Sequence, residues 1–315
     1  MNNATEMDAV AGAAGPAFDP LYVAARAVLL DGLEALREQR RSVVLVGAQA
    51  VYLRVGAGDL ATTPHTTDAD LAFDPALLRP QPPLDHALSD AGLIAKIGSD
   101  GPIVGSWVAE RTVAGQPVLI DLDVLVPDAV GGVGRRAARL PGHGGVTARK
   151  AVGLELALVD NDEMDVRSLD PVDERTYRVR VAGVAALLVA KVHKVAERLD
   201  DPRRNQEIAK DALDVLRVLR GSDIAEIARV LTAARTGGLP VNSRSDDDRA
   251  ALTAAITATT ESALVALRGD FAGAGSRGAL LAGRAASGRD DPAIVAASLA
   301  AYVNRLLDAV TTRTG

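Results

Sequence analysis

Residues 43–74 read VVLVGAQAVYLRVGAGDLATTPHTTDADLAFD, and this stretch decides the fold that we expect. The run Val43–Val46 is apolar and β-branched, which predicts a buried strand, and it stops at Gly47. Residues Ala48–Arg54 then have helical character, so a strand passes into a helix at a glycine. Because the first N–H groups of a helix have no partner within it, this junction can seat an anion.

A second strand is expected at Thr67–Phe73, and it carries two aspartates. Asp68 and Asp70 are two residues apart, so they share one face of the strand, with Cα atoms roughly 6.5–7 Å apart. Two such carboxylates repel each other, and one tends to keep a proton unless a cation lies between them. Mg²⁺ is a hard ion that carboxylate oxygens chelate. An anion seat followed by a carboxylate pair points to chemistry on a nucleoside triphosphate.

Composition is that of an ordinary soluble globular protein, with 315 residues, 48% apolar and 24% charged. The absence of cysteine excludes disulfides, Cys-zinc sites and thiol catalysis, and it fits a reducing cytosol. The longest apolar runs, Val181–Ala190 and Ala293–Tyr302, are shorter than a membrane span, and the N-terminus has no secretory signal. We therefore expect a cytoplasmic protein without a membrane partner, beginning with a flexible tail at residues 1–17.

The net charge of −6 argues against general nucleic-acid binding, but the basic residues are unevenly distributed. Residues 131–150 contain five basic side chains and no acid, namely Arg135, Arg136, Arg139, Arg149 and Lys150. Such a local patch can bind RNA on an acidic protein. The alternative interpretation is a solvated surface loop.

The pattern along the chain predicts an α+β protein. Strands are also expected at 93–97, 104–113, 118–126, 154–160, 164–169 and 177–181, and helices at 21–37, 82–92, 184–199, 205–220, 223–236, 247–268 and 291–313, with a long flexible loop at 131–145. Composition changes near Gly183, after which apolar residues follow helical spacing. We therefore predict two domains, a mixed sheet with helices over 18–182 and an all-helical domain over 183–315.

A third carboxylate is expected from the sequence VLIDLDVLVP. Asp121 and Asp123 alternate with apolar residues, so both face the same side of a strand. We favour Asp123 as the partner of Asp68 and Asp70, because it enters the apolar run Val124–Val126 most abruptly. Two solvated acids on a half-exposed strand are the alternative interpretation.

Lys191 falls inside the apolar stripe of the helix 184–199, whereas His193 and Glu197 fall on the opposite, polar face. A lysine on a buried face needs a partner or a ligand, unless its stem is buried and its ammonium stays in water. In the next helix Asp211 lies at the margin of the apolar stripe, and Asp214 lies farther round. Lys191 and Asp211 could form a structural ion pair, or line a cleft facing Asp68 and Asp70, or both.

Other common sites are not indicated. The four histidines, His65, His86, His143 and His193, have no metal-ligand spacing, and no Gly-Lys-Ser/Thr follows Gly47 as a Walker loop requires.

Two stretches resemble a known family. VGAQAVYL…TTDADLAFD resembles the first motif of the DNA polymerase β-like nucleotidyltransferase superfamily, a glycine turn followed by Asp-x-Asp. VAGVAALLVAKVHKVAER…KDALDVL resembles the AbiEii and MenT branch of type IV toxins, which carry a helix with a lysine and then a Lys-Asp-x-x-Asp helix. The likeness covers residues 43–74, 118–126 and 181–219.

The resemblance implies a nucleotidyltransferase fold, a mechanism and site residues. Asp68, Asp70 and Asp123 would hold Mg²⁺ or Mn²⁺, and with Lys191 and Asp211 they would form the catalytic set. The nucleotide would be bound by Gly47, Ala48, Thr66, Thr67 and Lys191. The enzyme would transfer NMP from an NTP to RNA, most typically the tRNA 3′ end, as the toxin of a pair with an antitoxin protein. Residues Arg135 to Lys150 would then contact the RNA backbone.

Two other functions compete with this one. Some superfamily members modify small molecules, as antibiotic-modifying enzymes do, and a closed pocket would favour that class, whereas a wide basic groove favours RNA. Here Gly47-Ala48 replaces the family's Gly-Gly or Gly-Ser, so a serine hydroxyl is missing. This departure also fits a catalytically inactive member that binds a nucleotide or a partner protein.

Overall fold

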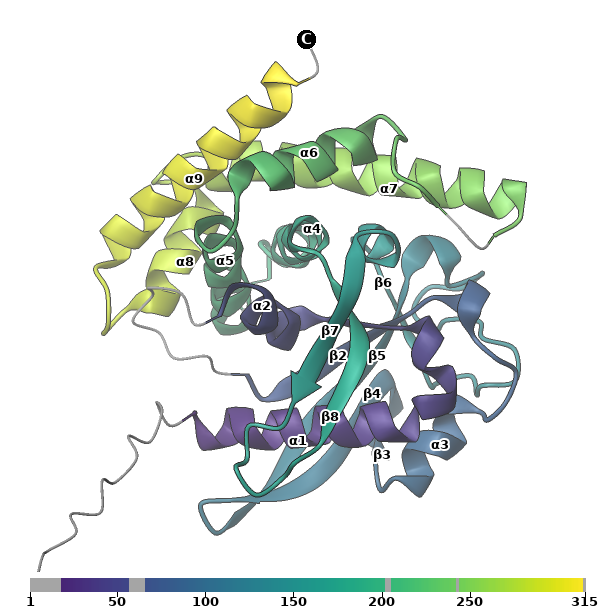
Figure 1. Ribbon diagram of the computed structural model, residues 1–315. Helices are drawn as coiled ribbons and strands as arrows, with labels where there is room; N and C mark the ends of the chain where they lie inside the picture. Colours follow the sequence, from purple (N-terminus) through teal and green to yellow (C-terminus); the bar gives the residue numbers. More distant parts are fainter. Residues whose placement is uncertain (1–17, 57–65, 202–204, 242–243, 314–315) are drawn as a thin grey trace, which may run out of the picture.

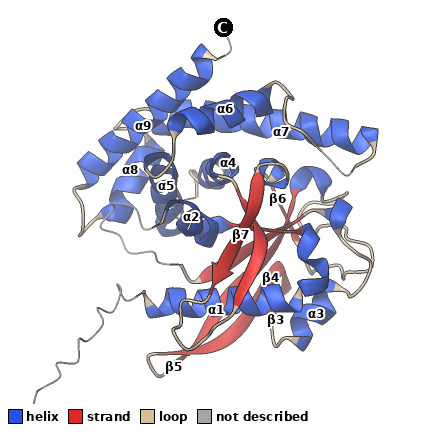
Figure 2. Cartoon of the chain, viewed as in Figure 1, coloured by secondary structure: helices blue, strands red, loops and turns tan. Residues whose placement is uncertain are grey.

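A mixed sheet of eight strands forms the centre of the protein, and a helical region follows it along the chain (Figures 1 and 2). The structure, a computed structural model, describes residues 18–56, 66–201, 205–241 and 244–313. The strands are β1 (Val43–Val46), β2 (Asp68–Phe73), β3 (Ile94–Gly98), β4 (Gly101–Val113), β5 (Gln116–Pro127), β6 (Arg149–Ala151), β7 (Asn161–Arg167) and β8 (Thr176–Ala182). Their order is β3-β4-β5-β2-β1-β8-β7, and β6 pairs with β5 beside that path.

Helices cover the sheet and build the C-terminal region. They are α1 (Pro20–Ala35), α2 (Gly47–Val55), α3 (Leu84–Asp90), α4 (Val184–Ala196), α5 (Asn205–Arg220), α6 (Ile224–Arg235), α7 (Asp246–Ala266), α8 (Arg277–Ala286) and α9 (Pro292–Thr312). In Figure 1, α1 crosses the sheet, and α4 to α9 gather above it. The start of α7 is typical: the Ser245 side chain accepts from the Asp248 N–H, and acidic residues in the first turn complement the helix dipole.

The hydrophobic core is continuous from the sheet into the helical region. Fully buried side chains such as Leu45 on β1, Val192 on α4 and Leu306 on α9 belong to one cluster. The α+β class and the C-terminal helical region are therefore as expected. The division at residues 182 and 183 into two domains stays a prediction.

Three parts of the expected secondary structure differ from the observed one. Residues 154–160 were expected as a strand, and that prediction is wrong: Glu155–Leu158 form a 3₁₀ turn. The Glu155 carboxylate accepts a hydrogen bond from the N–H of Gly153 at 2.8 Å and another from the N–H of Ala129 at 3.3 Å. These bonds connect the turn to the residues just before it and to the segment that follows β5. Strand β6 and helix α8 were not anticipated.

The segment after β5 is irregular, as expected for residues 131–145, but backbone bonds hold it in place. Ala138 N–H donates to Ala148 O at 2.9 Å, and Lys150 N–H donates to Arg136 O at 2.8 Å. The side chain of Leu140 is buried. The expected tail at 1–17 and nearly all of the expected loop at 56–65 lie outside the described residues.

Two helices are long and apolar enough to cross a membrane by length and composition, although the apolar runs in the sequence predicted none. They are Asp246–Phe271 and Pro292–Thr312. The most apolar window of each is partly buried inside the fold, at 33% and 44% of its residues. Both helices pack against neighbours in the helical region, α7 against α4 and α6, and α9 against α6 and α8.

Candidate functional site

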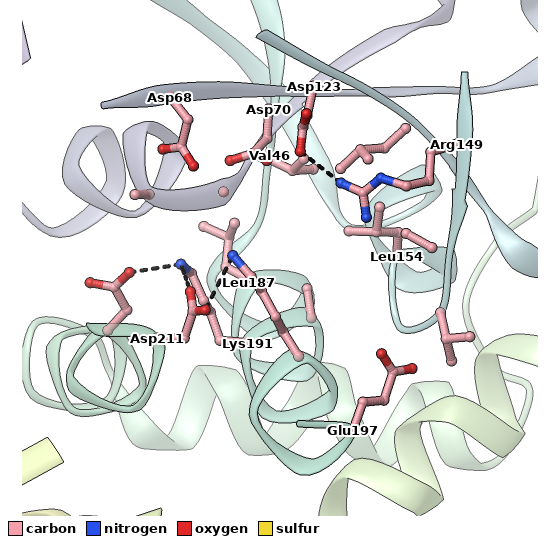
Figure 3. Close-up of a pocket in the computed structure, with 18 of the residues that line it drawn as sticks. Val46, Asp68, Asp70, Asp123, Arg149, Leu154, Leu187, Lys191, Glu197 and Asp211 are labelled. Atoms are coloured by element: carbon pink, nitrogen blue, oxygen red, sulfur yellow. Dashed lines mark hydrogen bonds and ion pairs between the residues drawn. The ribbon is translucent and has the colours of Figure 1, made fainter. Parts of the chain in front are cut away.

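The strand register brings the aspartates of two sequence-distant stretches together. Strands β2 and β5 are parallel neighbours, with Asp68 opposite Asp121 and Asp70 opposite Asp123. Because side chains two residues apart share a face, all four point the same way. Figure 3 shows Asp68, Asp70 and Asp123 along one side of a cleft.

The junction of β1 and α2 lies directly against this carboxylate group. Gly47 has a positive φ of 72°, and a Cβ built on it would lie 1.9 Å from Asp70 Oδ2. Glycine is therefore needed here both for the backbone conformation and for the close approach. Among the described residues no side chain caps the N-terminus of α2, and its first residue, Gly47, lies against Asp70, so the predicted anion seat and the carboxylates are adjacent.

Crowding of negative charge changes the protonation of Asp70. Burial and the neighbouring Asp68 raise the pKa of Asp70 from its ordinary 3.8 to about 7, and Asp123 acts in the same direction. Lys194 and Lys191 oppose the shift, but they do not cancel it. A carboxyl group held neutral in this way is what a carboxylate cluster shows before a cation joins it.

Two of the predicted metal ligands, Asp68 and Asp123, form hydrogen bonds with other side chains in this structure. The Thr66 hydroxyl donates to Asp68 Oδ1, and Arg149 Nη2 donates to Asp123 Oδ2 at 2.7 Å. Among the described residues, no three His, Cys, Asp or Glu side chains converge as a ready metal site. The donor set is nevertheless one that Mg²⁺ prefers, because every oxygen comes from a carboxylate. Mg²⁺ binding at Asp68, Asp70 and Asp123 stays a prediction.

Both candidates for the third carboxylate line the cleft and are paired with a cation. Asp121 pairs with Lys96, whose Nζ lies 2.8 Å from Oδ1 and 2.9 Å from Oδ2, and Asp123 pairs with Arg149. Asp121 lies opposite Asp68 in the strand register, and Asp123 lies opposite Asp70. The choice of Asp123 over Asp121 stays a prediction.

Lys191 is buried in an ion-pair cluster that joins α4 to α5. Its Nζ lies 2.6 Å from Asp211 Oδ1 and 2.7 Å from Asp214 Oδ2, and its side chain is only 6% exposed. Burial alone would lower the pKa of Lys191, but the two carboxylates raise it well above its ordinary value. The ammonium is therefore not in water, and the expected ion pair with Asp211 is confirmed. Asp214 was expected farther round the helix, yet it is an equal partner.

His193 was expected on a polar face, and that prediction is wrong. The residue is buried, with Nε2 2.8 Å from the carbonyl oxygen of Thr259 on α7. Helix α7 packs against the side of α4 that sequence spacing assigned to solvent. Glu197 is exposed as expected, and it lines the cleft.

One cleft of about 630 Å³ contains nearly all of the predicted site. Its lining includes Gly47, Ala48, Thr66, Thr67, Asp68, Asp70, Asp123, Lys191, Asp211, Arg135, Arg149 and Lys150. Arg136 and Arg139 are exposed and are not part of the lining. In Figure 3, Lys191 and Asp211 lie across the cleft from the three aspartates. Groups from four separate parts of the chain thus meet in one place.

Two groups near the site were not anticipated. Lys194 lines the same cleft, and its Nζ lies 3.1 Å from Asp211 Oδ2. Gln49 is buried and donates to the backbone carbonyl of Asp68 at 3.1 Å, while its Oε1 accepts from Arg26 Nε at 2.8 Å. Both signals were present in the sequence: Lys194 follows Lys191 by three residues, and Arg26 lies on the apolar stripe of α1.

No family model matches this chain, and neither a curated protein nor a solved structure matches it.

Proposed function

We propose that this protein is a Mg²⁺-dependent nucleotidyltransferase, which moves an NMP group from an NTP to an acceptor and releases pyrophosphate. One observation carries the proposal: Gly47, Asp70, Asp123 and Lys191, which come from four different helices and strands, line one cleft in a complementary arrangement. A helix N-terminus without a side-chain cap adjoins the carboxylates, and the buried ammonium of Lys191 lies opposite them. This arrangement would suit both an anion and a divalent cation.

Asp68, Asp70 and Asp123 would hold the metal ion, with Mn²⁺ as a substitute for Mg²⁺. When bound, the ion would neutralise the carboxylates and stabilise the charge that develops on the phosphates. The backbone N–H groups of Gly47 and Ala48 would bind phosphate oxygens at the start of α2. Thr66 fixes the orientation of Asp68 through its hydroxyl, and Thr67 is exposed at the rim of the cleft.

Nucleotide transfer would be a single displacement at the α-phosphorus of the NTP. An acceptor hydroxyl oxygen forms a bond to the α-phosphorus of the NTP, and the bond from that phosphorus to the α,β-bridging oxygen breaks. The electron pair of the broken bond leaves with pyrophosphate, and the proton of the acceptor hydroxyl passes to the solvent. Little covalent chemistry is required of the protein, so positioning and charge stabilisation account for catalysis.

For the acceptor we propose RNA, and in particular the 3′ end of tRNA, with the protein acting in the cytoplasm as the toxin of a toxin–antitoxin pair. Support comes from Arg135, which lines the cleft, and from Arg136 and Arg139, which follow it in the chain; all three are exposed and form no ion pair with any described residue. Free guanidinium groups suit phosphate contacts. An antitoxin protein would be the corresponding partner.

A small-molecule acceptor is the second candidate, and one observation favours it. Arg149 and Lys150, two of the five basic residues, are engaged inside the protein: Arg149 with Asp123, and Lys150 with Asp128 at 3.0 Å. The cleft of about 630 Å³ is also within the range that holds one nucleotide-sized ligand with a small partner. An inactive member that only binds a nucleotide or a partner protein is the third candidate, supported by Ala48 in place of serine or glycine.

The test is nucleotide transfer by the purified full-length protein. It is incubated with Mg²⁺, each α-labelled NTP in turn and total tRNA, beside an Asp68→Ala control. We expect label on tRNA from at least one NTP, and none with Asp68→Ala. Label on a small acceptor but not on RNA would establish the second candidate. Binding of NTP without any transfer would support the third, and absence of Mg²⁺–NTP binding would contradict both enzyme proposals.

A further inference from the structure

Lys191, to which the resemblance assigns a place near the nucleotide, is held in place by two buried carboxylates. Its bonds to Asp211 and Asp214 are 2.6 and 2.7 Å long, and the side chains of those partners are 6% and 4% exposed. Movement of Lys191 toward a ligand would break two buried charge-assisted bonds at once, and among the described residues only Lys194 and Arg217 would then remain paired with Asp211 and Asp214. Its position and contacts are those of a residue that ties α4 to α5.

Lys194 lies three residues further along α4 and has more freedom. Its side chain is 38% exposed, and within the part of the chain that the structure describes it forms one ion pair, to Asp211 Oδ2 at 3.1 Å. Asp211 retains Lys191 on its other oxygen, Oδ1, when Lys194 departs. Lys194 can therefore turn toward a ligand without leaving a buried charge unpaired.

Lys194 lines the same cleft as the carboxylates Asp68, Asp70 and Asp123. Both Lys194 and the start of α2 line the cleft, and helices α2 and α4 pack against each other. A phosphate chain that begins at the carboxylates thus has backbone N–H groups on one side and Lys194 on the other.

We infer that Lys194 is the cation that binds the β- and γ-phosphates of the NTP, whereas Lys191 is a positioning residue that fixes Asp211 and the α4–α5 junction. This inference rests on the proposed function, since it assigns a role within the same cleft. A lysine suits the role because its ammonium is a mobile point charge with three donors. When the Lys194 ammonium leaves Asp211, the phosphates take the place of the carboxylate as its anionic partner.

The experiment measures binding of each NTP and the matching NMP by isothermal titration with Mg²⁺, together with the melting temperature of every variant. The variants are Lys194→Met, Lys194→Arg and Lys191→Met. Arg305→Met removes a charge from the exposed surface of α9 and serves as the control. The NMP comparison matters because only the NTP carries the two outer phosphates.

We expect Lys194→Met to weaken NTP binding roughly ten- to hundredfold and NMP binding less than about threefold, which is the loss of a charge-assisted contact. Its melting temperature should change by less than about 3 °C, because the lost ion pair is partly exposed. Lys194→Arg should recover part of the NTP affinity, and Arg305→Met should behave as wild type. Lys191→Met should instead lower the melting temperature strongly.

Equal NTP affinity in Lys194→Met and wild type would overturn the inference and leave the proposed function intact. Equal weakening of NTP and NMP binding would also overturn it, because a disturbed fold affects both ligands. If the wild-type protein binds no NTP, the proposed function itself fails, and this inference fails with it.

Discussion

Gly47 and Asp70 are in such close contact that a Cβ on residue 47 would meet the Asp70 carboxylate at 1.9 Å. The turn that would bind phosphate and the carboxylate that would bind metal are therefore one unit, built where β1 ends beside β2. Any side chain at position 47 would displace the carboxylate as well as the turn. Phosphate and metal binding should consequently be lost together when this contact is disturbed.

Gly47→Ala is expected to lower stability and to abolish nucleotide binding. The positive φ alone costs an alanine about 1–2 kcal/mol, and the clash with Asp70 adds to that. Chemical denaturation and NTP titration measure the two effects. Ala48→Ser at the next residue is the control, because position 48 follows in the helix without contacting Asp70 in this way; it should keep the fold and bind NTP at least as well as wild type. Wild-type behaviour of Gly47→Ala would disprove the contact.

The stability of the metal-free protein should fall as the pH rises from about 4 to about 7. In that window folded Asp70, with a pKa of about 7, keeps a proton that the unfolded chain, with a pKa near 3.8, has released. The folded state therefore binds more protons, so its free energy of unfolding decreases with pH and this contribution levels off above pH 7. Asp70→Asn should flatten this part of the profile, as measured by denaturation in EDTA at successive pH values. An unchanged slope in Asp70→Asn would show that another group titrates.

Arg149→Gln is expected to strengthen Mg²⁺ binding in the absence of nucleotide. Arg149 occupies Asp123 Oδ2 at 2.7 Å, and its positive charge also repels a cation at that position. Without it, the carboxylate becomes available and the local potential more negative. The shift in melting temperature on adding MgCl₂ measures the effect, with Arg305→Gln as the surface control. An identical response in Arg149→Gln and wild type would mean that Asp123 takes no part in metal binding.

Gln49→Leu should destabilise the protein by about 2–4 kcal/mol. The side chain bonds to Arg26, to the Ala25 carbonyl and to the Asp68 carbonyl, and its removal leaves a buried guanidinium short of one acceptor. Urea denaturation measures the loss, and Gln116→Leu at the exposed start of β5 is the surface control. A loss as small as that of the control would show that Arg26 finds another acceptor.

Local pattern was enough to predict the strands and helices that carry the site. Val43–Val46 was predicted to the residue, and β2 begins one residue later than expected. These segments are apolar, regularly spaced and bounded by glycine or a polar turn, so neighbouring residues alone determine them. The Asp-x-Asp spacing also placed each pair of carboxylates on one face without knowledge of the partner strand.

Features that depend on a distant partner could not be predicted. His193 is buried because α7 covers that side of α4, and nothing in the sequence of α4 indicates α7. Strand β6 has only three residues, too few for a periodicity, and Gly105 allows its backbone to approach β4 and β5. Helix α8 contains glycines, which are unfavourable in a helix interior, and it was not predicted; a Cβ on Gly283 would lie 2.4 Å from the Pro292 carbonyl oxygen, so close helix packing explains that glycine.

The parallel register of β2 and β5 has a consequence for how such a chain can change in length. Asp70 and Asp123 are neighbours because the strands align, not because of the number of residues that separate them. Insertions or deletions within residues 74–115 would therefore leave the carboxylates together as long as the pairing is kept. A shift of a single residue in β5 would instead turn Leu122 into the cleft and send both of its aspartates to the apolar side. The loops between these elements are free to vary in length, whereas the alignment of β2, β4 and β5 is not.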